Sequence, residues 1–146
     1  SLAIERLRDK GVPTVAIISD LTAEALAAYI GHDNREVGRT AAWIVGKAAN
    51  DFGKIGIIVG SHRYLCQETA EISFRSYFRE HAPEFRLLEP LVNLEDSRIA
   101  YEATLDMMER NPDRAGLDIC GGGMVGVIEA VREEADASPS STRTPP

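Results

Sequence analysis

Short apolar runs rich in β-branched residues alternate with longer stretches of helical period along this chain. Residues 12–19, VPTVAIIS, form a near-continuous apolar run that suits a parallel strand buried on both faces. Residues 55–59, IGIIV, are the clearest strand, and residues 28–31 and 117–120 are shorter ones. Each strand leads through a short loop into a helix, which is typical of right-handed βαβ units. The sequence therefore predicts an α/β fold built on a doubly wound parallel sheet.

Residues that favour helix ends bound the predicted helices. Asn34 and Ser97 stand where N-caps are expected, since their side chains can accept a bond from a free backbone N–H. Gly11 is expected to end a first helix, and Pro83 a helix over residues 67–81 whose inner face carries Ala70, Phe74, Tyr77 and Phe78. The helix over residues 35–50 is expected to bury a stripe made of Val37, Ala41, Ile44, Val45 and Ala48.

Two further apolar segments complete the pattern. Residues 85–92 are predicted to be a strand, and Pro90 places its far end on an edge or at a bend. After Ser97, the residues Ile99, Ala103, Leu105 and Met108 include spacings suited to helix packing. From Ala135 the chain contains Pro, Ser and Thr without an apolar period, which predicts a disordered tail.

Composition excludes several classes of function. The 146 residues provide for one domain of ordinary size, and a formal charge of −7 argues against a broad nucleic-acid surface. No apolar run is long enough to span a membrane, and Ser1 opens into a helical pattern rather than a signal peptide. Cys66 and Cys120 lie in no metal-ligand or redox spacing, so we expect reduced thiols in a cytoplasmic protein, with no metal and no cofactor.

Candidate ligand-binding residues follow the predicted strands. Open α/β sheets bind ligands outside the carboxyl ends of their strands, which here are residues 32–34, 61–66, 93–96 and 121–123. The predicted ligand-binding residues are Ser61, His62, Arg63, Cys66, Asn93 and Gly121. For each one the simpler alternative is a solvated loop or a helix cap. Asp33 and Asn34 fit that alternative best, as hinge and cap residues.

No residue pattern predicts catalysis. Residues 121–126, GGGMVG, match the G-x-G-x-x-G of dinucleotide-binding turns, but no acidic ribose ligand stands about 20 residues beyond. A turn that brings a polar ligand close to the backbone is the alternative. Cys66 has no base near it in sequence and fits a small buried hydrophobe better than a nucleophile. We therefore expect a binding protein rather than an enzyme.

In their order, these features resemble the effector-binding region of LacI-family transcriptional regulators, which have the type 1 periplasmic binding protein fold. The similar segments are GVPTVAIISD at residues 11–20, the strand that runs into Asp33-Asn34 with Gly38 beyond it, GKIGIIVG at residues 53–60, and the strand, turn and helix of residues 117–127. The resemblance covers about residues 1–134.

The resemblance implies a two-lobed protein that closes around a sugar or a related metabolite. Residues 1–32 would be the end of the N-terminal lobe and the first crossover, residues 33–134 an incomplete, Rossmann-like C-terminal lobe, and residues 135–146 a disordered tail. Two polar anchors of the family differ, because Ala70 stands for its ligand-clamping Arg and Cys120-Gly121 replaces Asn-Asp. His62 or Arg63 could substitute, which would favour a ligand with a carboxylate or a phosphate.

Three functions follow from these patterns. The first is the effector-sensing domain of a cytoplasmic, homodimeric regulator that contacts DNA only through a helix-turn-helix outside this sequence. The second is the periplasmic solute-binding protein of a sugar transporter. The third, based on residues 121–126 alone, is a nucleotide-dependent enzyme. For the effector-sensing domain of a regulator, we expect a small-molecule partner and no membrane association.

Overall fold

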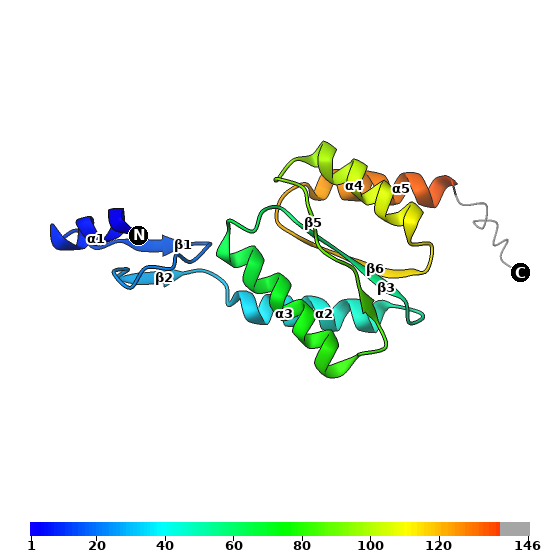
Figure 1. Ribbon diagram of the computed structural model, residues 1–146, viewed down its shortest axis with the longest axis horizontal. Helices are drawn as coiled ribbons and strands as arrows, with labels where there is room; N and C mark the ends of the chain where they lie inside the picture. Colours follow the sequence, from blue (N-terminus) through cyan, green and yellow to red (C-terminus); the bar gives the residue numbers. More distant parts are fainter. Residues whose placement is uncertain (138–146) are drawn as a thin grey trace, which may run out of the picture.

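A computed structural model describes residues 1–137 and has two parallel sheets (Figure 1). Strands β1 (Val15–Ile17) and β2 (Ala28–Ile30) pair with each other beside helix α1 (Leu2–Asp9). The larger sheet contains β3 (Lys54–Val59), β4 (Arg86–Leu87), β5 (Leu91–Val92) and β6 (Arg114–Cys120). The predicted α/β class with parallel strands is confirmed.

Strand β3 is the centre of the larger sheet. Along one edge it pairs with β4 at its start and with β5 at its end, and along the other edge it pairs with β6. The single strand predicted over residues 85–92 is thus two short strands separated around Pro90, which agrees with the predicted bend. Ile55, Ile57, Ile58 and Val59 are almost completely buried, so β3 is also the centre of the core.

Helices cover both faces of the larger sheet (Figure 1). On one face α2 (Asn34–Ala48) packs against α3 (Leu65–His81), and on the other α4 (Ser97–Arg110) packs against α5 (Met124–Ala137). The inner face of α3 is as predicted, with Ala70, Phe74 and Phe78 buried and Tyr77 partly buried. Helix α5 extends three residues into the predicted tail, whose remaining residues 138–146 lie outside the described part.

Two predicted apolar faces are wrong in part. In α2 the buried residues are Gly38 and Ala42. Ala41 and Val45 of the predicted stripe pack against the core, whereas Val37 and Ile44 are exposed. The reason is that α2 lies so close to α3 that small residues must form the contact. In β1 only Ala16 is buried, and Val15 and Ile17 are 45% and 66% exposed, because their face of this two-stranded sheet is uncovered.

The N-caps predicted at Asn34 and Ser97 are each displaced by one residue, and Asp33, predicted with Asn34 as a hinge and cap residue, is a cap. Asp33 and Asp96 cap α2 and α4, because each carboxylate accepts bonds from two backbone N–H groups of the first turn. Asn34 and Ser97 are instead the first helical residues. Asp is as good an N-cap as Asn or Ser, so the choice between neighbours depends on backbone geometry that the sequence does not reveal.

Replacing Asp96 by Ala is expected to lower the free energy of unfolding by about 1 kcal/mol, because the amides of Arg98 and Ile99 lose their acceptor. Ser97→Ala is the matched control, with an expected change of a few tenths of a kcal/mol at most. Urea denaturation of both variants measures the difference. A larger loss for Ser97→Ala would mean that Ser97 is the true cap.

Candidate binding cleft between the two sheets

The carboxyl ends of the two sheets face each other (Figure 1). Because all strands of the larger sheet are parallel, the loops after β3, β5 and β6 meet at one edge. Strands β1 and β2 point toward that edge from the other side. The two parts touch where the backbone N–H of Cys66, in the first turn of α3, donates to the hydroxyl of Ser19 at 3.3 Å. Open parallel sheets bind ligands at edges of this kind.

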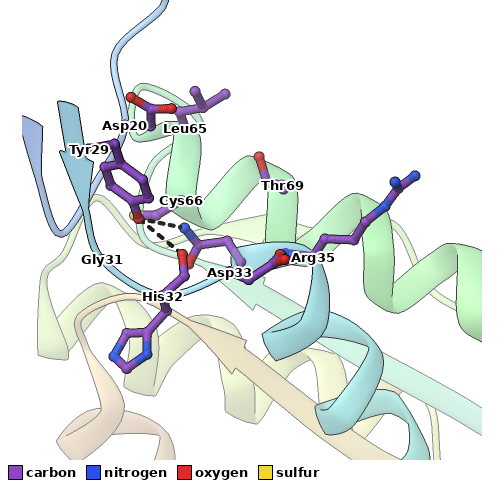
Figure 2. Close-up of a pocket in the computed structure, with 10 residues that line it drawn as sticks. Asp20, Tyr29, Gly31, His32, Asp33, Arg35, Leu65, Cys66 and Thr69 are labelled. Atoms are coloured by element: carbon purple, nitrogen blue, oxygen red, sulfur yellow. Dashed lines mark hydrogen bonds between the residues drawn. The ribbon is translucent and has the colours of Figure 1, made fainter. Parts of the chain in front are cut away.

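A pocket of about 430 Å³ lies at this junction (Figure 2). Its walls come from the ends of β1 and β2, the start of α2 and the first turns of α3. The side chains that Figure 2 draws belong to Asp20, Tyr29, His32, Asp33, Asn34, Arg35, Leu65, Cys66 and Thr69, and Gly31 completes the wall. Carboxylates, an amide and hydroxyls therefore line a space of the size that small ligands occupy, whereas the Arg35 guanidinium is directed away from Tyr29 (Figure 2).

Tyr29 holds one wall of the pocket together (Figure 2). Its hydroxyl lies 3.0 Å from the carbonyl oxygens of both Ile18 and His32 and can donate to one of them at a time. It also accepts a hydrogen bond from Asn34 Nδ2 at 3.3 Å. This hydroxyl links the end of β1, the crossover into the larger part and the start of α2. The sequence offered no motif that marks Tyr29.

Asp33, Asn34 and Cys66 are the predicted residues that line this pocket. The carboxylate of Asp33 is occupied as a cap, accepting from the N–H groups of Arg35 and Glu36 at 3.0 and 3.2 Å. The side-chain amide of Asn34 donates a hydrogen bond to the Tyr29 hydroxyl and does not cap the helix. Asp33 is thus a cap, and the hinge role of both residues stays a prediction.

The other predicted ligand residues lie on the loops of the larger sheet, outside the wall of this pocket. His62 and Arg63 are exposed, and within residues 1–137 their side chains form no ion pair or hydrogen bond. The Ser61 hydroxyl accepts from the backbone N–H of Arg63 at 3.2 Å. Asn93 is completely buried, with its amide bonded to the backbone of Glu95 and Gly122. Asn93 therefore shapes the loops from within rather than facing a cleft.

The glycines of residues 121–126 make room for neighbouring atoms of the protein itself. A Cβ atom at Gly121 would lie 2.6 Å from Nε2 of Gln67, and one at Gly123 would lie 2.3 Å from Nδ2 of Asn93. At Gly126 it would lie 1.8 Å from the carbonyl oxygen of Ser97, where α5 crosses α4. The space that a pyrophosphate would need is filled, so the G-x-G-x-x-G match does not indicate a dinucleotide site.

The partly buried thiol of Cys120 and carboxylate of Asp118 in β6 both have raised pKa values. Burial raises the pKa of the Cys120 thiol, and the nearby Asp118 carboxylate raises it further. Burial also raises the pKa of Asp118, although the hydrogen bond from the Cys120 Sγ at 3.5 Å lowers it in part. A protonated thiol is a poor nucleophile. Within residues 1–137 no three His, Cys, Asp or Glu residues are placed to hold a metal ion.

Comparison with known proteins identifies the architecture. A family described as periplasmic binding protein domain matches residues 2–140, nearly the whole chain. The chain belongs to this family. No curated protein sequence matches it.

Solved structures agree with this assignment of the periplasmic binding protein domain. The glucose-galactose binding protein GanP of Geobacillus stearothermophilus is 21% identical, with a TM-score of 0.83 over 92% of this chain and 48% of that chain. An ABC transporter solute-binding protein of Agrobacterium vitis with bound D-fucose is 20% identical, with a TM-score of 0.85 over 93% and 48%. A structure named XylFII is 22% identical, with a TM-score of 0.82 over 90% and 48%.

These similarities confirm the predicted type 1 periplasmic binding protein fold. The domain spans about half the length of the solved structures that it matches. Among the described residues, no helix is both long enough and apolar enough to cross a membrane.

Proposed function

We propose that this periplasmic binding protein domain is part of a sugar-binding protein that closes over its ligand. The observation that carries the proposal is the cleft, where the carboxyl ends of two parallel sheets face each other, with a pocket of about 430 Å³ at the crossover between them. Two similar structures support a sugar as the ligand, since one is named a glucose-galactose binding protein and another contains D-fucose. A binding role, rather than an enzymatic one, fits a family of binding proteins.

The division into lobes is part of this proposal. Residues 1–32 would end the first lobe and residues 33–134 would form most of the second, which is consistent with the separate sheets of β1–β2 and β3–β6. The crossover near His32, Asp33 and Asn34 would act as a hinge. A ligand that contacts both lobes favours the closed form and shifts the population toward it.

Two biological settings fit such a protein. Similar structures include an ABC transporter solute-binding protein, which supports solute capture for a sugar transporter. The segments that resemble LacI-family regulators support a cytoplasmic, dimeric effector domain whose closure alters DNA binding by a helix-turn-helix. The coding sequence upstream of Ser1 separates the two. A signal peptide there favours the transporter, and a helix-turn-helix favours the regulator.

Replacing Arg63 by Ala in the full-length protein is expected to weaken sugar binding by about tenfold or more. The exposed guanidinium is not engaged by any side chain in residues 1–137, so it is free to donate several hydrogen bonds to ligand oxygens. Isothermal titration calorimetry with a panel of neutral monosaccharides measures the change. Arg132→Ala, which removes an exposed arginine of α5, is the matched control. Equal affinity of wild type and Arg63→Ala would remove Arg63 from the binding site.

A further inference from the structure

Gln67 and Glu95 form a latch across the loops at the carboxyl edge of the larger sheet. Gln67 Nε2 donates to Glu95 Oε1 at 2.5 Å, and Gln67 Oε1 accepts from the backbone N–H of Ser61 at 2.8 Å. The other Glu95 oxygen accepts from the backbone N–H of Gly122. The Gln67–Glu95 latch therefore joins the loops that follow β3, β5 and β6.

Buried Asn93 supports the latch from below. Its Oδ1 accepts from the backbone N–H of Glu95 at 2.9 Å, and its Nδ2 donates to the carbonyl of Gly122 at 2.8 Å. Leu94 and Glu95 have φ values of 55° and 64°, a left-handed conformation that is uncommon for residues with a side chain. The loop thus adopts an unfavourable backbone conformation with the Glu95 carboxylate at the point where the three loops meet.

Three glycines provide the space for this carboxylate and its partner. A Cβ atom at Gly60 would lie 2.0 Å from Glu95 Oε1, and one at Gly122 would lie 2.2 Å from Glu95 Oε2. A Cβ atom at Gly121 would approach the Gln67 amide to 2.6 Å. Glycine at all three positions is thus a condition for the latch.

The electrostatic consequence is a fixed negative charge at this edge. Glu95 is exposed and forms no ion pair with any residue in the described chain. Its carboxylate also accepts a hydrogen bond from the backbone N–H of Gly122, just before α5. Free backbone N–H groups at the start of a helix attract anions. The Glu95 carboxylate therefore repels an anionic group that approaches this edge. It also occupies the backbone N–H of Gly122, which could otherwise donate to that group.

We propose that Glu95 sets the specificity of the site, so that it accepts neutral sugars and amino sugars and rejects sugar acids and sugar phosphates. This inference rests on the proposed function, since it names the class of sugar that the cleft takes. It opposes the expectation that Arg63 favours a carboxylate or a phosphate, because hydrogen bonds to Gln67 and to the backbone of Gly122 fix the Glu95 carboxylate at this edge, whereas the Arg63 side chain has no bonding partner in residues 1–137. A carboxylate can still accept hydrogen bonds from sugar hydroxyls and from an ammonium group.

The test compares matched ligands on the full-length protein by isothermal titration calorimetry. The probes are D-glucose and D-galactose, the amino sugar of each, and the uronic acid of each. We expect wild type to bind at least one neutral or amino sugar about tenfold or more tightly than the corresponding uronate. Glu95→Gln removes the charge and is expected to reduce this ratio about fivefold or more. Glu109→Gln, on an exposed residue of α4 without a bonding partner in residues 1–137, is expected to leave it unchanged.

A second measurement needs no variant. If Glu95 rejects anions by its charge, the wild-type preference shrinks when salt rises from about 20 to about 500 mM, because screening shortens the range of the repulsion. A uronate bound more tightly than the neutral sugar, or a preference unmoved both by Glu95→Gln and by salt, overturns the inference and leaves sugar binding intact. Failure of every sugar to bind overturns the proposed function, and the inference with it.

Discussion

Replacing Phe74 by Ala is expected to lower the free energy of unfolding by about 3–5 kcal/mol, which is the largest effect of any single truncation considered. Phe74 is completely buried in α3, and its ring centroid lies 5.1 Å from that of Phe78. The same cluster contains Ile55, Ile57 and Val59 of β3, so the cavity would open against the central strand. Equilibrium urea denaturation followed by circular dichroism measures the loss.

Ile72→Ala is the matched control on the same helix. Ile72 is 53% exposed, so its truncation leaves no cavity and is expected to cost well under 1 kcal/mol. The contrast between two nearby positions separates core packing from helix propensity, since both variants place Ala in the interior of α3. Similar losses at Phe74 and Ile72 would contradict the position of α3 against the sheet.

The fold class was predictable because the central strand shows its burial in its composition. The run at residues 55–59 is apolar and β-branched, which favours a buried strand, and the aromatic residues of α3 repeat at a period that defines one face. The inner face of α2 follows hydropathy only in part, since Ala41 and Val45 pack against the core but its buried residues are Gly38 and Ala42. Two helices in close contact require small side chains between them. The spacing of large apolar residues therefore does not predict which residues form such a contact.

The candidate site was less predictable, for a related reason. Its chemistry depends on pairs of residues far apart in sequence, such as Gln67 with Glu95 and Tyr29 with the carbonyl of Ile18. Strand ends indicated loops that do meet in space, because parallel strands bring their ends to one edge. They could not reveal that Asn93 is buried or that the glycines at residues 121–123 accommodate Gln67, Glu95 and Asn93.

Gly38→Ala and Gly46→Ala are expected to have opposite effects, although both change glycine to alanine in α2. At Gly38 a Cβ atom would lie 2.1 Å from the carbonyl oxygen of Ala70 in α3, so the two helices must separate. Forcing extra atoms into a packed contact costs about 1–3 kcal/mol, and the neighbouring atom here is backbone, which places the cost toward the upper end of that range. Urea denaturation is expected to show this loss for Gly38→Ala.

At Gly46 the nearest atom to a Cβ is Phe78 Cε1 at 3.6 Å, which is an ordinary van der Waals contact. Alanine there removes the entropic cost of glycine in a helix and is expected to stabilise the protein by about 0.5–1 kcal/mol. Two destabilised variants would indicate that α2 tolerates no added side chain on this face. Two stabilised variants would contradict the close approach of α2 to α3 at Ala70. This approach places Asp33 and the start of α2 in the wall of the pocket.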